Sequence, residues 1–150
     1  MNIPAPTECP YYLISRVYLE ITSKLKQNFR KKNLEKVNPS FLGILFALSF
    51  SDSIKTSALG KLVGLESSTM TGLIDRMENA GLVKRVADPD DKRANLIVLT
   101  KEGLKSCDQV AEISTEVLKD IFVDIREEDL STTINVLKQV LINSKRGIFK

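Results

Sequence analysis

Apolar side chains recur at helical spacing along most of this chain. Between residues 10 and 32 they follow one another every three or four positions, and Pro10 suits the first turn of a helix, where its missing N–H costs nothing. The stripe consists of Tyr11, Ile14, Tyr18, Ile21, Leu25 and Phe29. The pattern predicts one long amphipathic helix over residues 10–32.

Three further stretches carry helical patterns of different kinds. Residues 39–50 begin with a proline and are apolar on most sides, from Phe41 to Phe50, which is typical of a central core helix. A broad apolar stripe follows Thr100, and a narrower one follows the acidic residues 127–129, which suit a helix N-terminus electrostatically. We therefore expect a mainly α-helical chain of the α+β class.

Residues 57–101 combine two short helices with two strands. The first helix ends near Gly64, which can supply the left-handed residue of a tight turn, and the second runs from Ser67 to Ala80. Its inward positions are Met70, Leu73, Ile74 and Met77. Two strands at 82–87 and 95–99 flank a charged loop at 88–93. This order of elements is the layout of a winged helix-turn-helix.

The outward positions of the second helix are small and polar, and an arginine follows them. A helix of this kind is suited to lie in a major groove of DNA. Taken alone, such residues are more often ordinary solvent-facing positions, and the charges of the loop would more often belong to a solvated turn. Because helix-turn-helix and charged hairpin follow one another directly, their joint spacing favours DNA binding.

Composition excludes several kinds of site. The chain has no histidine, so histidine-based acid–base catalysis and histidine-ligated metal are excluded within it. Cys9 and Cys107 are too few and too far apart to predict a disulfide scaffold or a zinc site, and no cofactor is expected. A net charge of +3 is compatible with nucleic acid without requiring it. Neither a membrane span nor a signal peptide is predicted, so we expect a soluble, cytoplasmic protein.

Four motifs then carry a resemblance: ALGKLVGL, STMTGLIDRMENAGLVKR, the loop DPDDKR, and IVLTKEG. Together, residues 54–104 resemble the MarR family of bacterial transcriptional regulators, and the flanking helices match in number and order. The resemblance implies a single domain over residues 1–150. Its winged helix-turn-helix would occupy residues 39–100, and the flanking helices 10–32 and 101–150 would form a dimerisation arm. It also implies sequence-specific binding of double-stranded DNA, usually to repress, and no enzymatic activity.

The resemblance also implies roles for individual positions. Bases or phosphates would be contacted from the recognition helix by Ser67, Ser68, Thr69 and Thr71, with Arg76 near the DNA backbone. The DNA-binding wing would consist of Asp91, Lys92 and Arg93, with Arg93 in the minor groove and Asp91 steadying it. Arg85 would brace the wing with Asp75 as its partner.

Two positions depart from the family pattern. Glu66 stands where serine is common before the recognition helix, and it is a poorer N-cap and a negative charge where phosphates approach. Gly72 stands where many relatives carry a larger, often basic residue. Both departures imply fewer direct DNA contacts than usual.

The flanking helices have more apolar surface than the small winged core can cover. We therefore expect a two-fold homodimer on a pseudo-palindromic operator, with recognition helices about 34 Å apart. Relatives commonly lose DNA affinity when a small, often phenolic ligand enters a pocket between the arm and the winged core. Here that pocket would be lined by Tyr11, Tyr12, Phe46 and Phe50, although aromatic residues at such spacings are more often core.

Cys9 offers a second possible signal. At a helix N-terminus its thiolate would be favoured by the helix dipole, and some relatives sense peroxides through such a cysteine assisted by tyrosines. A cysteine without a role is the common case, however. Two other classes stay open: a winged-helix protein adaptor that does not bind DNA, and a thiol enzyme whose base would have to be Lys, Tyr or a carboxylate.

Overall fold

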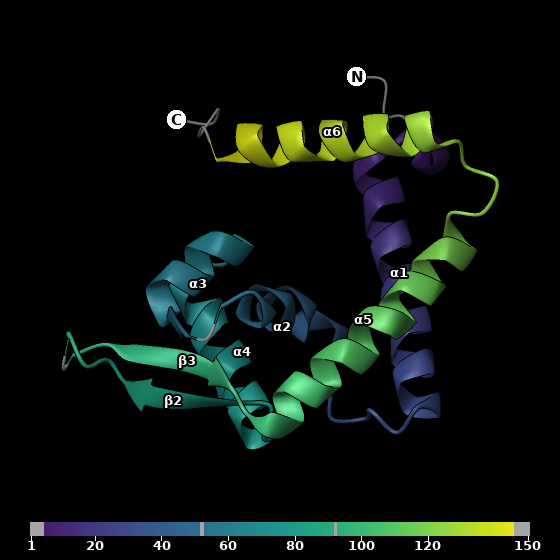
Figure 1. Ribbon diagram of the computed structural model, residues 1–150. Helices are drawn as coiled ribbons and strands as arrows, with labels where there is room; N and C mark the ends of the chain where they lie inside the picture. Colours follow the sequence, from purple (N-terminus) through teal and green to yellow (C-terminus); the bar gives the residue numbers. More distant parts are fainter. Residues whose placement is uncertain (1–4, 52, 92, 146–150) are drawn as a thin grey trace. The chain divides into compact units, whose positions relative to one another are not determined.

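The computed structural model describes residues 5–51, 53–91 and 93–145. The described elements follow the order expected from the sequence (Figure 1). They are η1 (Pro6–Glu8), α1 (Pro10–Lys31), η2 (Pro39–Phe41), α2 (Leu42–Ser49), β1 (Ile54–Lys55), α3 (Thr56–Val63), α4 (Ser67–Asn79), β2 (Val83–Ala87), β3 (Asn95–Leu99), α5 (Lys101–Ile121) and α6 (Glu127–Ser144). The predicted α+β class with a winged helix-turn-helix is confirmed.

The chain divides into two compact units, residues 1–118 and residues 119–150. The first unit holds the winged helix-turn-helix together with α1 and most of α5. The second unit holds α6, of which no residue is buried. Among the described residues, no helix is both long and apolar enough to cross a membrane.

The sheet is a three-stranded antiparallel one in the order β1-β3-β2. The hairpin of β2 and β3 pairs Val83 with Leu99 and Ala87 with Asn95. Ile54 pairs with Ile97 on the opposite edge of β3. The sequence pattern did not predict β1, because two residues are too short for an alternating pattern.

The core of the first unit forms where α2, α3 and α4 pack with the sheet. Leu45, Leu59, Ile74, Met77 and Ile97 are completely buried there. The other predicted inward positions of α4 are buried as well. Burial of this face turns the opposite side of α4 toward solvent.

Phe50 differs from its expected place in the core helix. The helix α2 ends at Ser49, and Phe50 follows it as the C-cap residue with 90% of its surface exposed. Its ring therefore lies outside the core, because α2 ends one residue before it.

The turn between α3 and α4 uses Gly64 as expected. Gly64 is left-handed with a φ of 72°, and the next residue, Leu65, donates its N–H to the carbonyl of Gly60 at 2.9 Å. This closes α3 with a Schellman-type hydrogen bond and directs the chain into α4.

The junction of β3 with α5 explains why the motif IVLTKEG has threonine at position 100 and glycine at position 103. The hydroxyl of Thr100 accepts the N–H of Gly103 at 2.9 Å, and it donates to the carbonyl of Gly81 at 2.6 Å. A Cβ on Gly103 would lie 1.9 Å from the carbonyl oxygen of Leu82. Only glycine allows α5 to start this close to the beginning of the hairpin.

Gly103→Ala should therefore lower the free energy of unfolding by at least about 2 kcal/mol, because the clash is with backbone. Gly72→Ala is the matched control, since a Cβ there meets nothing within 4 Å. This second change lies on the exposed side of α4 and should raise the free energy of unfolding by about 0.5 to 1 kcal/mol through helix propensity. Urea unfolding of both variants measures these effects, and a Gly103→Ala protein as stable as wild type would contradict the account.

Candidate nucleic-acid interface

The exposed side of α4 is a row of small polar side chains. Ser67, Ser68, Thr69 and Thr71 are all exposed, with Met70 buried between them. The Thr71 hydroxyl donates to the carbonyl of Ser67 at 3.0 Å and keeps its lone pairs for a ligand. Such hydroxyls can donate to or accept from base edges and phosphates.

Arg76 lies one to two turns further along α4 and is also exposed. Its Nε donates to the carbonyl of Gly72 at 3.2 Å, so the side chain folds back along its own helix. The remaining guanidinium N–H groups are free to meet a phosphate.

The start of α4 lacks a side-chain cap. Glu66 occupies the N-cap position with an extended backbone, and its carboxylate accepts no capping hydrogen bond. The N–H groups of the first turn therefore point outward without a side-chain partner. They form a small positive region, which the charge of Glu66 opposes.

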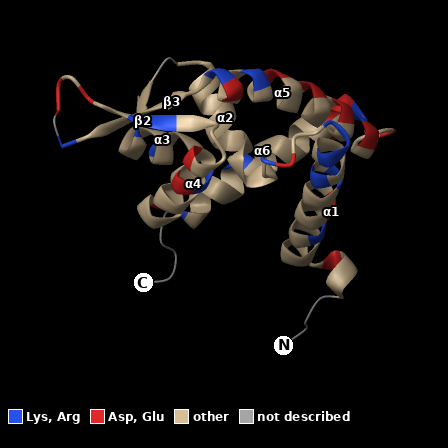
Figure 2. Cartoon of the chain, turned by 90° about the horizontal axis from the view of Figure 1, so that it is seen from below, with Lys and Arg blue, Asp and Glu red and all other residues tan. Residues whose placement is uncertain are grey.

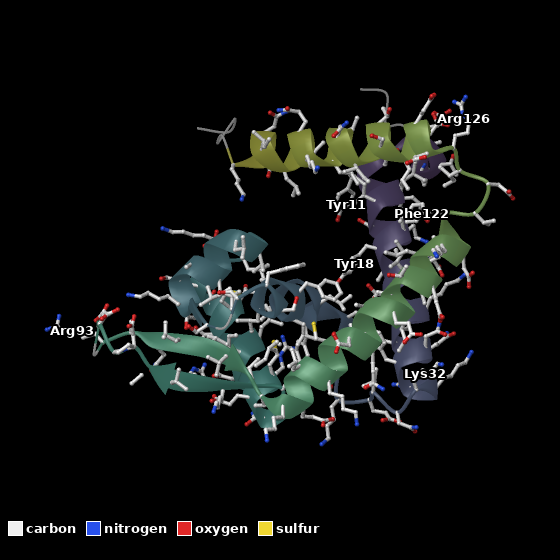
Figure 3. All side chains as sticks on the ribbon, viewed as in Figure 1. Tyr11, Tyr18, Lys32, Arg93, Phe122 and Arg126 are labelled. Atoms are coloured by element: carbon white, nitrogen blue, oxygen red, sulfur yellow. The ribbon has the colours of Figure 1, made fainter. Side chains whose placement is uncertain are left out.

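The wing is a turn shaped by two aspartates. Asp88 accepts the N–H of Asp90 at 2.9 Å, and Asp91 accepts the N–H of Arg93 at 3.1 Å. Asp91 thus holds Arg93 through its backbone amide, and the Arg93 side chain extends away from the hairpin at its tip (Figure 3). Lys92, the third predicted wing residue, lies outside the described residues.

Arg85 joins the wing to the recognition helix. Its guanidinium contacts Asp75 at 2.6 Å and also pairs with Glu78, and its backbone N–H donates to Glu78 at 3.1 Å. The hydrogen bond to Asp75 is the main reason why the pKa of Arg85 is raised, with Glu78 adding to it. Sequence reasoning missed Glu78, although its spacing of three from Asp75 places both carboxylates on one side of α4.

A second ion pair, absent from the sequence analysis, joins the wing to β1. Lys55 Nζ lies 2.8 Å from Asp88 Oδ2 and 4.0 Å from a carboxylate oxygen of Asp91. Only 4% of the Asp88 side chain is exposed. The close approach of Lys55 lowers the pKa of Asp88, and the carboxylate in turn raises the pKa of Lys55, so both groups stay charged across the neutral range.

The wing and the start of α3 enclose a notch of about 310 Å³. It is lined by Lys55, Thr56, Ser57, Arg93, Ala94 and Asn95. Two cationic and two hydroxyl-bearing residues thus line a space that is large enough for a phosphate group.

Acidic groups interrupt the basic ones on this side of the protein. Figure 2 shows Asp and Glu positions both on α4 and at the wing, next to the Lys and Arg positions. Most of these carboxylates are engaged, since Asp75 and Glu78 pair with Arg85, and Asp88 pairs with Lys55. Among the described residues of α4 and of the loop at 88–93, Arg76 and Arg93 are the cationic side chains that form no ion pair with another described residue.

The residues assigned to a ligand pocket are not enclosed in a single protomer. Tyr11, Tyr12 and Phe50 are exposed at 80%, 44% and 90%, and Phe46 is half-buried. A pocket lined by them would need a further surface to cover the two tyrosines.

The two cysteines have different surroundings. Cys9 is the half-buried N-cap residue of α1, whereas Cys107 is buried and lies 3.6 Å from the carbonyl oxygen of Leu45. Burial raises the pKa of the Cys107 thiol, so this cysteine is protected from reaction. Within the described part of the chain, no group of three His, Cys, Asp or Glu side chains could hold a metal ion.

Comparison with known proteins gives concordant results. The family model described as MarR family matches residues 37–94. The HTH-type transcriptional regulator SarZ of Staphylococcus haemolyticus is 30% identical over 129 residues, which cover 84% of this chain and 86% of that protein.

Two solved structures share the fold at low sequence identity. A mutant of MarR from E. coli, complexed with operator DNA, has a TM-score of 0.75 and 22% identity, covering 86% of this chain and 91% of that one. BpsR of Bordetella bronchiseptica, whose DNA binding is regulated by 6-hydroxynicotinic acid, has a TM-score of 0.80 and 18% identity, covering 93% and 97%.

Glu66→Ser should stabilise the protein and tighten its binding to DNA. Serine would cap the first turn of α4, raising the free energy of unfolding by about 1 kcal/mol, and the change removes a negative charge from the phosphate approach. Glu112→Ser, at an exposed position in the middle of α5, is the control and should change stability by less than about 0.5 kcal/mol. Urea unfolding and fluorescence anisotropy with duplex DNA measure the two effects, and weaker DNA binding by Glu66→Ser would contradict this view of the helix start.

Proposed function

Since this chain belongs to the MarR family of transcriptional regulators, we propose that it represses transcription by binding a pseudo-palindromic operator in duplex DNA as a homodimer. The chain is a DNA-binding regulator of that family and not an enzyme, as the sequence predicted. The observation that carries the finer proposal is the joint exposure of the α4 hydroxyls and of Arg93 on one braced unit.

In this proposal, α4 enters the major groove and the wing follows the adjacent backbone. Ser67, Ser68 and Thr69 meet base edges or phosphates with the free N–H groups of the first turn, and Thr71 supplies an acceptor. Arg93 enters the minor groove, where the potential is most negative at narrow A·T steps. Arg85 keeps the distance between the two contacts fixed through Asp75 and Glu78.

The homodimer is supported by apolar faces that a single protomer leaves exposed. On α1 these include Ile14, Val17 and Tyr18, which are 47%, 50% and 63% exposed. On α6, which has no buried residue, they include Ile134, Leu137, Val140 and Leu141. Helices of this length are marginal alone in water, and apolar faces of this extent mark interaction sites. A second copy would cover both faces and set two recognition helices about 34 Å apart.

We also propose that a small molecule releases the protein from DNA. A small aromatic effector would bind near Tyr11, Tyr12, Phe46 and Phe50, and in the dimer a second copy would cover the exposed rings of Tyr11, Tyr12 and Phe50. This is supported by the same fold in BpsR, whose DNA binding is regulated by 6-hydroxynicotinic acid.

Oxidation of Cys9, the N-cap of α1, is the second candidate signal. Replacing Cys9 by serine separates the two, because only oxidation needs the thiol. Both act in the cytoplasm, where we place the protein.

Arg93→Ala should weaken binding to all duplex sequences by about tenfold and lower the slope of log affinity against log salt by about 1, because one phosphate-region contact is lost. The measurement is fluorescence anisotropy at several salt concentrations. Lys119→Ala, an exposed residue in the last turn of α5, is the control and should leave the slope unchanged. If wild-type binding does not depend on salt and Arg93→Ala has no effect, the adaptor interpretation is favoured instead.

Light scattering at micromolar concentration should give about twice the protomer mass of 16.8 kDa. Leu137→Glu on the apolar face of α6 should shift the protein toward the monomer, because it would place a charge in the apolar surface that the proposed dimer buries. Leu62→Glu, on the exposed side of α3, is the matched control and should leave a dimer. A monomeric wild-type protein would contradict the homodimer.

A further inference from the structure

We propose that Lys55 is a positioning residue for DNA binding, which holds the wing in its binding position through Asp88. Lys55 belongs to β1, so it lies outside both the recognition helix and the wing. The inference rests on the proposed DNA-binding function, to which it adds a residue that sets the geometry of the interface.

Asp88 is the residue at which the wing loop closes. Its N–H donates to the carbonyl of Ala94 at 3.2 Å, and its own carbonyl accepts the N–H of Asp91 at 3.4 Å. Its Oδ1 atom accepts the N–H of Asp90 at 2.9 Å, while its Oδ2 atom lies 2.8 Å from Lys55 Nζ. One carboxylate thus joins the turn that carries Arg93 to the edge strand of the sheet.

The burial of Asp88 is the reason why its ion pair with Lys55 affects the position of the wing. Only 4% of the Asp88 side chain is exposed, so its charged carboxylate needs a counter-charge, and the Lys55 ammonium 2.8 Å away supplies it. Lys55 Nζ also lies 4.0 Å from a carboxylate oxygen of Asp91. Asp91 is the residue that accepts the Arg93 N–H, so a single lysine faces both aspartates that shape the wing.

The backbone of β1 fixes where Lys55 can reach. Lys55 pairs with Leu96 on β3, while its neighbour Ile54 pairs with the buried Ile97. Because side chains of a strand alternate, Ile54 and Lys55 point to opposite sides of the sheet, and the Lys55 side chain reaches Asp88 of the wing. The residue after it begins α3, so this short strand connects the wing position with the first helix of the helix-turn-helix.

Direct contact of Lys55 with a DNA phosphate is the alternative. Lys55 and Arg93 line the same notch, and 46% of the Lys55 side chain is exposed. The two roles predict opposite results for Asp88. If Lys55 binds phosphate, neutralising Asp88 frees the lysine and removes a negative charge, so DNA binding tightens. If Lys55 positions the wing, neutralising Asp88 releases the wing and DNA binding weakens.

The test is a double-mutant cycle in the full-length protein, using Lys55→Met, Asp88→Asn and both together, with affinity for operator duplex measured by fluorescence anisotropy. Asp88→Asn keeps an oxygen acceptor for the Asp90 N–H and replaces the oxygen that faces Lys55 by an uncharged NH2 group. We expect each single change to weaken binding about tenfold, and the double change to be no weaker than either, because both remove the same tether. Lys84→Met, an exposed lysine of β2, is the matched control and should combine additively with Asp88→Asn.

The slope of log affinity against log salt concentration is a second readout, because its value depends on the number of phosphate contacts. Lys55→Met should leave the slope of log affinity against log salt close to that of wild type, whereas loss of a phosphate contact would lower it by about 0.9. Tighter or unchanged binding by Asp88→Asn, additive effects of the pair, or the lower slope would each overturn the proposal. If Lys55→Met does not fold, the direction of the Asp88→Asn effect alone decides.

Amide hydrogen exchange of the free protein separates this inference from the proposed function. The amides of Asp90, Asp91 and Ala94 should exchange faster in Lys55→Met and Asp88→Asn than in wild type, while the β2–β3 ladder stays protected. A wild-type protein that does not bind DNA would contradict the proposed function. Unchanged exchange in both variants would instead overturn the tether, whether or not DNA is bound.

Discussion

The burial of one face of α4 determines which side chains of this helix are exposed to solvent. Met70, Leu73, Ile74 and Met77 are buried in the core of the winged unit, and their spacing leaves a single direction for the small polar residues at the start of the helix. The turn at Gly64 fixes the angle at which α4 leaves α3, and the close contact at Gly103 fixes where α5 leaves the hairpin. Packing of the buried side thus sets the direction in which the exposed side of α4 faces, and the small polar residues only determine its chemistry.

The tip of the wing, by contrast, is held by charge. Buried side chains such as Val83 and Ile97 anchor the two strands, whereas none of the described residues of the loop at 88–93 is a large apolar one. Arg85 connects β2 to Asp75 and Glu78 of α4, and Lys55 connects the loop to β1. These pairs also use up carboxylates that would otherwise repel phosphate. In the proposed interface, these acidic residues would therefore hold its geometry.

Local patterns in the sequence were sufficient for most of the fold. Helical spacing located α1, α2, α4 and α5 to within a few residues, and the alternation in 95–99 located β3, because burial of one side imposes these periods. The strand β1 and the exposure of Phe50 were not predictable, since the first is two residues long and the second depends on where a helix ends. The family motifs indicated Arg93, Arg85 and Asp75. They gave no indication of Lys55, because its link to Asp88 joins residues that come together only when the sheet forms.

The central claim is that two copies of this winged unit bind one duplex. A hydroxyl-radical footprint on the DNA upstream of the protein's own gene tests it most directly, because such regulators often control neighbouring genes. The account predicts two protected half-sites about one helical turn apart, each with protection of the flanking minor groove where Arg93 would lie. Protection of a single half-site, or no protection at salt concentrations where the dimer is intact, would contradict it.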